Sequence, residues 1–228
     1  MNLLLMAIAP VMVIIIYIYF QDKHEKEPMG LLLASFLFGA IVSILIVTIL
    51  YMFTGRLIPV TNQHSVWQQF IQAFIVVALA EEFSKYVIVK YFNQPKKAFN
   101  EPYDGIIYAV MVSMGFACTE NIMYVLQGGF ETAILRAFTA VPAHATFGIL
   151  MGYYMGKAKF SKNRFQLNMA GLFLAVLFHG AYDFFLFIRF IPGISIGAFI
   201  SLAIGIYLSR KAIRKHQNNS NFKSLEDS

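Results

Sequence analysis

Charged side chains are scarce in this sequence of 228 residues: Asp, Glu, Lys and Arg make up 13%, against 58% hydrophobic residues and a mean hydropathy of +0.63. This balance excludes an ordinary soluble domain. The single cysteine, Cys118, excludes an intramolecular disulfide, and its place inside an apolar run indicates a packing role. The net charge of +6 comes from Lys and Arg residues clustered between apolar runs, which membrane orientation and anionic lipid explain without a nucleic-acid partner. We therefore expect a lipid bilayer around the chain, and no nucleic acid.

Polar sequence is confined to short connections between long apolar runs. Since a helix needs about 20 mostly apolar residues to cross the hydrocarbon core, these runs predict about seven transmembrane helices. Only a closed helical bundle satisfies the backbone in lipid, so the expected fold is an all-α polytopic membrane bundle. The expected spans are Leu3 to Phe20, Met29 to Phe53, Trp67 to Phe92, Gly105 to Leu126, Thr132 to Gly156, Met169 to Phe187, and Ile191 to Ser209.

The expected organisation is one transmembrane domain over residues 1–210, followed by a polar, disordered cytoplasmic tail over residues 211–228. The first apolar run has no Lys or Arg before it and no small-residue cleavage site after it. We therefore expect it to be retained as a helix and not removed as a signal peptide.

The distribution of Lys and Arg predicts the orientation of the chain, because cytoplasmic connections carry the excess of these residues. Alternate connections hold nearly all of them, and the other set contains only Arg56, Arg136 and Arg189. This bias places the N-terminus outside and the C-terminus in the cytoplasm.

Several ionisable residues lie inside the expected spans, where a charge at the helix centre costs roughly 2.5 to 3.5 kcal/mol. Counted from the cytoplasmic ends at about 1.5 Å per residue, three of them lie roughly 15 to 18 Å deep, and Glu120 and Asp183 lie about one turn further out. Residues from four helices thus converge near the bilayer centre. The set comprises Glu81, Glu82, Lys85, Glu120, His144, His179 and Asp183, of which Glu81, His144 and His179 are the three at equal depth.

Helical spacing places His179 and Asp183 on one face, and likewise Glu81 and Lys85, whereas Glu82 points about 100° away from Glu81. Each pair also has a purely structural interpretation, as a buried ion pair or an interhelical hydrogen bond. The small-residue stripe that follows His144, at Gly148, Gly152 and Gly156, indicates close helix packing. The shared depth of the polar residues favours a functional site, because structural pairs do not require it.

The order Glu-Glu-x-x-Lys, Phe-x-x-x-Glu and His-x-x-x-Asp on successive helices resembles the PrsW family of bacterial intramembrane proteases. The matching residues are Glu81, Glu82 and Lys85, then Phe116 with Glu120 and Asn121, then His179 with Asp183, while His144 resembles a further family histidine. The resemblance implies a bacterial cell-membrane protease that makes the first, site-1 cut in a single-span anti-sigma factor and so leads to release of an extracytoplasmic-function sigma factor in a stress response. The family is similar to the CAAX prenyl endopeptidases and bacteriocin self-immunity proteins, whose corresponding motif has a histidine in place of Glu120, which leaves the role of a metal open.

Peptide hydrolysis needs an activated water and a group that holds the developing oxyanion. We expect Glu81 or Glu82 to act as the base, and His179, oriented by Asp183, to be a metal ligand or an oxyanion donor. Lys85, Phe116 and Asn121 are expected in supporting positions.

A divalent metal, zinc in type, would offset the cost of burying so many carboxylates. The expected ligands are Glu120, His144 and His179, and the alternative is a metal-free mechanism that uses a glutamate and a histidine. Two other classes of protein fit the same buried residues: an ion-coupled membrane carrier with a proton relay, and a non-catalytic membrane immunity or scaffold protein.

Overall fold

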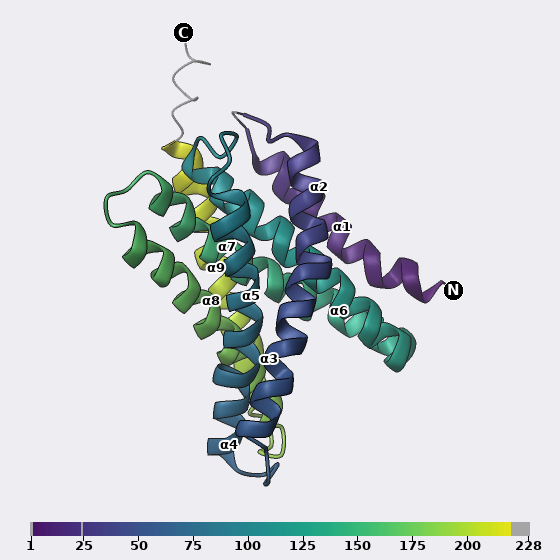
Figure 1. Ribbon diagram of the computed structural model, residues 1–228. Helices are drawn as coiled ribbons and strands as arrows, with labels where there is room; N and C mark the ends of the chain where they lie inside the picture. The colour runs from purple at the N-terminus through teal and green to yellow at the C-terminus, as the bar shows by residue number, and fades with distance from the viewer. Residues whose placement is uncertain (1, 24, 220–228) are drawn as a thin grey trace.

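The computed structural model describes residues 2–23 and 25–219, and this part of the chain is helical with no strand (Figure 1). Three stretches widen into π-helix, labelled η1 to η3, and they continue the neighbouring α-helices. The elements are α1 Leu3–Gln21, α2 Met29–Leu37, η1 Phe38–Ser43, α3 Ile44–Leu57, α4 Val66–Ile71, η2 Gln72–Ala78, α5 Leu79–Ile88, η3 Val89–Asn93, α6 Pro102–Phe138, α7 Ala140–Lys159, α8 Arg164–Phe187, and α9 Ile196–Asn218.

Within residues 2–23 and 25–219, five helical segments are long and apolar enough to cross a membrane. One of them, Pro102–Lys159, contains two expected spans, which turn back on each other where Gly129 adopts a φ of 70°. Glycine suits this turn because a side chain is disfavoured at positive φ. The segment from α4 to η3 is also helical, but its glutamines and charged residues lower its hydropathy, and it is not among the five.

Helix α9 differs from the expected boundary of the polar tail. It continues to Asn218, so the expectation of disorder is wrong for residues 211–218, while 220–228 lie outside the described residues. Ile213 and Ala212 are buried in the core, and the His216 ring lies 2.9 Å through Nε2 from the carbonyl oxygen of Tyr153. An apolar stripe therefore keeps the polar end of the helix attached to the bundle.

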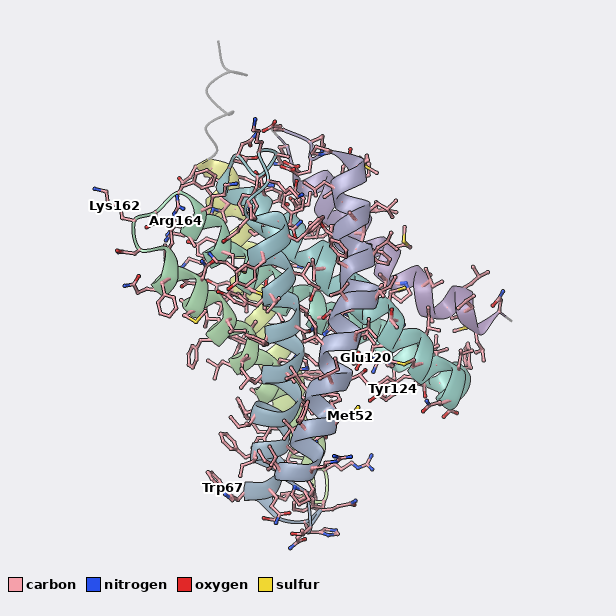
Figure 2. The ribbon with its side chains drawn as sticks, in the orientation of Figure 1. Met52, Trp67, Glu120, Tyr124, Lys162 and Arg164 are labelled. Atoms are coloured by element: carbon pink, nitrogen blue, oxygen red, sulfur yellow. The ribbon has the colours of Figure 1, made fainter. Side chains whose placement is uncertain are left out.

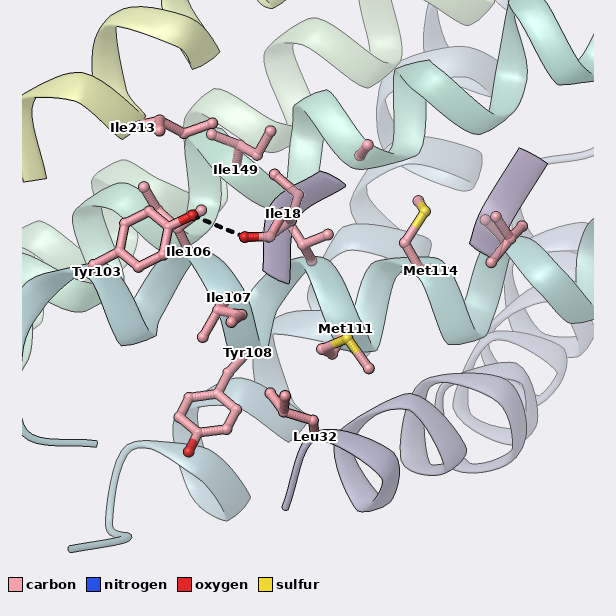
Figure 3. Packing of buried hydrophobic residues seen from close by; sticks show 14 of the residues in the cluster. Ile18, Leu32, Tyr103, Ile106, Ile107, Tyr108, Met111, Met114, Ile149 and Ile213 are labelled. Atoms are coloured by element: carbon pink, nitrogen blue, oxygen red, sulfur yellow. Dashed lines mark hydrogen bonds between the residues drawn. The ribbon is translucent and has the colours of Figure 1, made fainter. Parts of the chain in front are cut away.

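The main apolar core joins α1, α2, α6, α7 and α9 (Figure 3). Buried aliphatic side chains such as Ile18, Ile106 and Ile213 pack together there, and the Tyr103 hydroxyl donates a 3.2 Å hydrogen bond to the carbonyl of Ile18. Tyr103 is thus satisfied inside the core, as a buried hydroxyl must be.

Glycine allows α6 and α7 to approach each other closely. A Cβ on Gly152 would collide with the Gly105 carbonyl, and one on Gly156 would collide with the Pro102 carbonyl. Gly148 also faces α6, at Ser113. The predicted packing role of the small-residue stripe is confirmed, and α6 and α7 form the centre of the bundle.

Candidate active site

Helix α5 places Glu81, Glu82 and Lys85 in the interior, where each is at most 5% exposed. Lys85 lies three and four residues after the two glutamates, so its side chain reaches both. Lys85 Nζ lies 2.7 Å from Glu82 Oε1 and 3.8 Å from Glu81 Oε2. Glu82 is therefore the tightly paired carboxylate, and Glu81 the loosely paired one.

His179 on α8 is held between carboxylates. Its Nδ1 lies 2.8 Å from Glu82 Oε1, and its Nε2 lies 3.2 Å from Asp183 Oδ2 and 3.9 Å from Glu81 Oε2. Asp183 is four residues further along the helix, as the sequence predicts for a shared face. The ring of Phe147 stacks on His179 with centroids 4.8 Å apart. Contacts at both nitrogens and on the ring face fix the imidazole.

His144 on α7 lies between Lys85 of α5 and Glu120 of α6. Its Nδ1 lies 3.3 Å from Lys85 Nζ, and its Nε2 lies 2.9 Å from Glu120 Oε2 on α6. The ring is perpendicular to that of His179, with centroids 5.4 Å apart. Phe116 fills the remaining space: it meets the edge of His144 and lies under Lys85 Nζ at 4.3 Å. Burial of the ammonium over an aromatic face is favourable.

Two residues of this site were not identified from the sequence. Arg136 was counted as a loop cation, yet its Nη2 lies 2.7 Å from Glu120 Oε2 and its Nε donates a 2.7 Å hydrogen bond to Asn121 Oδ1. Tyr51 on α3 donates a 2.8 Å hydrogen bond to Glu81 Oε1. The turn at Gly129 was the available signal for Arg136, because it lets the following helix return toward the interior.

A cavity of about 610 Å³ opens beside these residues, between α3, η2, α5, α6, α7 and α8. Its polar lining includes five residues of the candidate site, namely Glu81, Glu120, His144, His179 and Asp183, together with Tyr51 and Arg136. Glu82 is fully buried and is not part of the lining. The structure therefore separates the two adjacent glutamates: Glu81 faces the cavity, and Glu82 anchors Lys85 and His179.

The ligand set for a metal differs from the one expected. Glu81, His144 and His179 each offer a ligand atom, all within 4.8 Å of one another, and no other such group occurs in the described residues. Glu120 is outside this group, and its Oε2 lies 2.7 Å from Arg136 Nη2 and 2.9 Å from His144 Nε2. Among the described atoms, Glu81 Oε2 is buried without a hydrogen-bond partner. Two imidazoles and one carboxylate, whose Oε2 has no hydrogen-bond partner, fit a catalytic divalent metal such as zinc.

Comparison with known proteins agrees with this geometry. Residues 27–217 match the family model described as PrsW family intramembrane metalloprotease. A protein of Geobacillus kaustophilus named Protease PrsW is 39% identical over 201 residues, which cover 87% of this chain and 86% of the relative. Proteins of the same name from Oceanobacillus iheyensis and Bacillus subtilis are 40% and 36% identical, covering 82% and 78% of this chain and 83% and 80% of the relatives.

No solved structure matches the chain. The relatives each cover most of the sequence, and the family model includes every residue of the cavity described above. The resemblance seen in the motifs is thereby confirmed, and so is the prediction of a membrane protease. The chain belongs to the PrsW family of intramembrane metalloproteases.

Proposed function

We propose that this protease makes the first cut in a single-span anti-sigma factor in the bacterial cell membrane, which leads to release of an extracytoplasmic-function sigma factor. The observation that carries the proposal is the buried cluster of Glu81, His144 and His179 at the wall of a cavity between helices. A site enclosed by apolar helices suits a substrate that is itself a membrane segment. Similarity to proteins named Protease PrsW, including that of Bacillus subtilis, supports the same activity.

The proposed topology has seven spans, with the N-terminus outside and the C-terminus in the cytoplasm. It adds two spans to the five apolar segments, by counting the α4–η3 segment and by dividing Pro102–Lys159 at its turn. Figure 2 supports the orientation: Lys162 and Arg164 lie at one end of the molecule, and Trp67 lies at the opposite end. An excess of cations at one end is typical of the cytoplasmic boundary, and a tryptophan is typical of either boundary.

In this proposal the Glu81 carboxylate acts at the reaction centre, either as a metal ligand or as the proton acceptor. Tyr51 occupies Oε1, so Oε2 is the atom presented to the space between His144 and His179. A divalent metal held there would turn its bound water into a nucleophile at neutral pH and polarise the scissile carbonyl. If Glu81 is a ligand, Glu120 and Asp183 remain in the cavity wall as carboxylates that can accept a proton. If it is not, Glu81 itself is the proton acceptor.

His179 is fixed for its task by two neighbours. Glu82 holds Nδ1 in position, which leaves Nε2 directed toward Glu81 and Asp183 at the cavity. Such a carboxylate on the far nitrogen orients a histidine that acts as a ligand or as a donor to an oxyanion. Lys85 neutralises Glu82, so the pair is a positioning device that remains behind the cavity wall.

The test is coexpression of the chain with candidate anti-sigma factors carrying a tag at each end. We expect an extracytoplasmic cut that yields two tagged fragments with the wild-type chain and none with Glu81→Gln, while both forms of the protease are inserted at equal amounts. Intact anti-sigma factors in the presence of wild-type chain would contradict the proposed substrate. Fragments that persist with Glu81→Gln would contradict the proposed site.

A further inference from the structure

The helices around the cavity form a ring that is open on one side. Going round it, α3 packs on η2, η2 on α8, α8 on α7, and α7 on α6. No comparable packing joins α6 back to α3 in the described part of the chain. The cavity is nevertheless lined from both sides of this gap, by Thr48 and Tyr51 of α3 and by Met123 and Tyr124 of α6.

The gap begins at a definite level of the membrane. On the α2 side of this level, α2 and η1 lie directly on α6. A Cβ on Gly39 would collide with the Val112 backbone, and one on Gly115 with the Phe36 carbonyl. The last hydrogen bond across this contact runs from Thr119 Oγ1 to the Ala40 carbonyl at 2.9 Å. Beyond that point α3 and the far half of α6 diverge, and Met52 and Tyr124 lie at the rim of the fork (Figures 1 and 2).

The sides of the fork combine apolar and polar groups. Met52, Met123 and Tyr124 are exposed, as expected of surface that faces lipid or another helix. Deeper in, Glu120 and Arg136 line the same cavity and remain partly exposed, at 16% and 13% of their side chains. Charged groups are costly toward acyl chains. A polypeptide can offer apolar side chains to the outer part and backbone polar groups to the inner part, whereas an acyl chain can offer only the first.

From this geometry we infer that the fork between α3 and α6 is the docking surface for one apolar transmembrane helix of the substrate, which reaches Glu81 by passing Tyr51. This inference rests on the proposed function and adds the route by which the substrate arrives. The same cavity is lined by Thr48 and Met123 at the fork and by Glu81. A helix seated there meets Tyr51 first, because the Tyr51 hydroxyl is bonded to Glu81 Oε1 from the α3 side.

A reversible bridge across the fork tests the route. In a Cys118→Ala background, Gly55→Cys and Gln127→Cys, which are exposed and lie beyond the lining on the helix faces of Tyr51 and Glu120, would be joined in membranes by a flexible thiol-reactive linker that contains a reducible disulfide. We expect cleavage of the anti-sigma factor to be lost in the bridged protein and restored when the linker is reduced. The matched control is the pair Ala40→Cys and Thr119→Cys, where the helices already touch, and bridging it should preserve cleavage.

The outcomes separate the route from the reaction. Equal cleavage before and after bridging of the fork would overturn the inference while leaving the proposed function intact. Loss of cleavage in both bridged pairs would also overturn it, because the effect would then be one of general rigidity. Absence of cleavage in the reduced proteins and in the wild-type chain would contradict the proposed function, and the docking surface with it.

Discussion

The hydroxyl of Tyr51 donates a hydrogen bond of 2.8 Å to Oε1 of Glu81 and so connects α3 to α5 across the cavity. A glutamate at this depth needs a partner for each oxygen, and Tyr51 satisfies one of them. The second oxygen, Oε2, has no hydrogen-bond partner among the described atoms. Because the two residues are 30 positions apart, the pairing depends entirely on how the helices are arranged.

Changing each of the two adjacent glutamates to glutamine should have a different effect, on cleavage for Glu81 and on stability for Glu82. Glu81→Gln replaces the carboxylate that would bind the metal or accept the proton by a neutral amide. We therefore expect cleavage to fall by about 10²-fold or more with little loss of stability. Glu82→Gln leaves Lys85 without its closest counter-ion, and we expect it to lower the free energy of unfolding by roughly 3–5 kcal/mol. Fragment yield and thermal unfolding in detergent measure the two effects, with exposed Glu131→Gln as control. Equal destabilisation by both changes would contradict the separation of tasks.

Metal content should follow the geometric ligand set. We expect purified protein to hold near-stoichiometric divalent metal, and His144→Ala, His179→Ala and Glu81→Gln each to lose it, because these three residues converge on one point. Glu120→Gln should retain the metal, since Glu120 lies outside that group. Elemental analysis of the purified variants measures this without reference to activity. The reverse pattern, with loss in Glu120→Gln and retention in Glu81→Gln, would restore the ligand set expected from sequence and make Glu81 the base.

The ion pair between Arg136 and Glu120 should be a stabilising contact. Both side chains are largely buried, so Arg136→Ala leaves a carboxylate without its counter-ion, at a cost on the order of 3 kcal/mol in unfolding free energy. Adding Glu120→Gln to that variant should recover part of the loss, which a double-mutant cycle measures. Exposed Arg189→Ala is the control. Additive effects of the two changes would show that the pair is not coupled.

Thiol labelling should report the topology. In the Cys118→Ala background, cysteines at Lys96 and Lys162 should react with a membrane-impermeant reagent only after the cytoplasmic side is exposed, because both lie in cation-rich connections. A cysteine at Gly128 should react in intact cells. Labelling of Lys162→Cys and Gly128→Cys from the same side would contradict the proposed seven spans.

A buried carboxyl next to the first connection should make stability depend on pH. Burial, opposed by Lys26 and assisted by Glu101, Glu27 and Glu25, raises the pKa of Asp22 from 3.8 to about 7. Since the folded-state pKa lies above the unfolded one, the stabilisation is complete below about pH 4 and is lost as the pH rises through about 7.

Unfolding of wild type and Asp22→Asn at pH 5 and pH 8 measures this effect. We expect wild type to lose about 2–4 kcal/mol relative to Asp22→Asn between these conditions. An identical pH dependence of the two proteins would show that the Asp22 carboxyl does not titrate in this range.

The sequence predicted the residues of the site better than their partners. Depth along each helix can be counted, and Glu81, His144 and His179 do meet at one level. The rotation of one helix relative to another cannot be counted, and for this reason the sequence predicts Glu120 as a ligand, whereas the three groups that converge in the structure are Glu81, His144 and His179. The pairing of Arg136 with Glu120 depends on which side chains meet after the chain folds back at Gly129, and span boundaries alone do not predict that.

Boundaries were predicted less well where composition and packing disagree. The polar end of α9 was expected to be disordered, but burial of Ile213 extends the helix to Asn218. The α4–η3 segment was expected to span the membrane, and its helical state is confirmed, although its glutamines and charges keep it below the apolarity of the five clear segments. Tertiary contacts, absent from a hydropathy profile, decide where α9 ends, whereas composition alone sets the α4–η3 segment apart.

The close glycine contact between α6 and α7 has a consequence for how the enzyme is made. These two helices are consecutive and fit together through Gly105, Gly152 and Gly156, so they can associate as a hairpin soon after insertion. That hairpin carries Glu120 and His144, but Glu81 arrives with α5 and His179 with α8. Half of the site therefore comes from helices outside the hairpin, α5 before it and α8 after it in the chain. Because α8 supplies His179, a chain inserted only as far as α7 lacks one of the two buried histidines of the site.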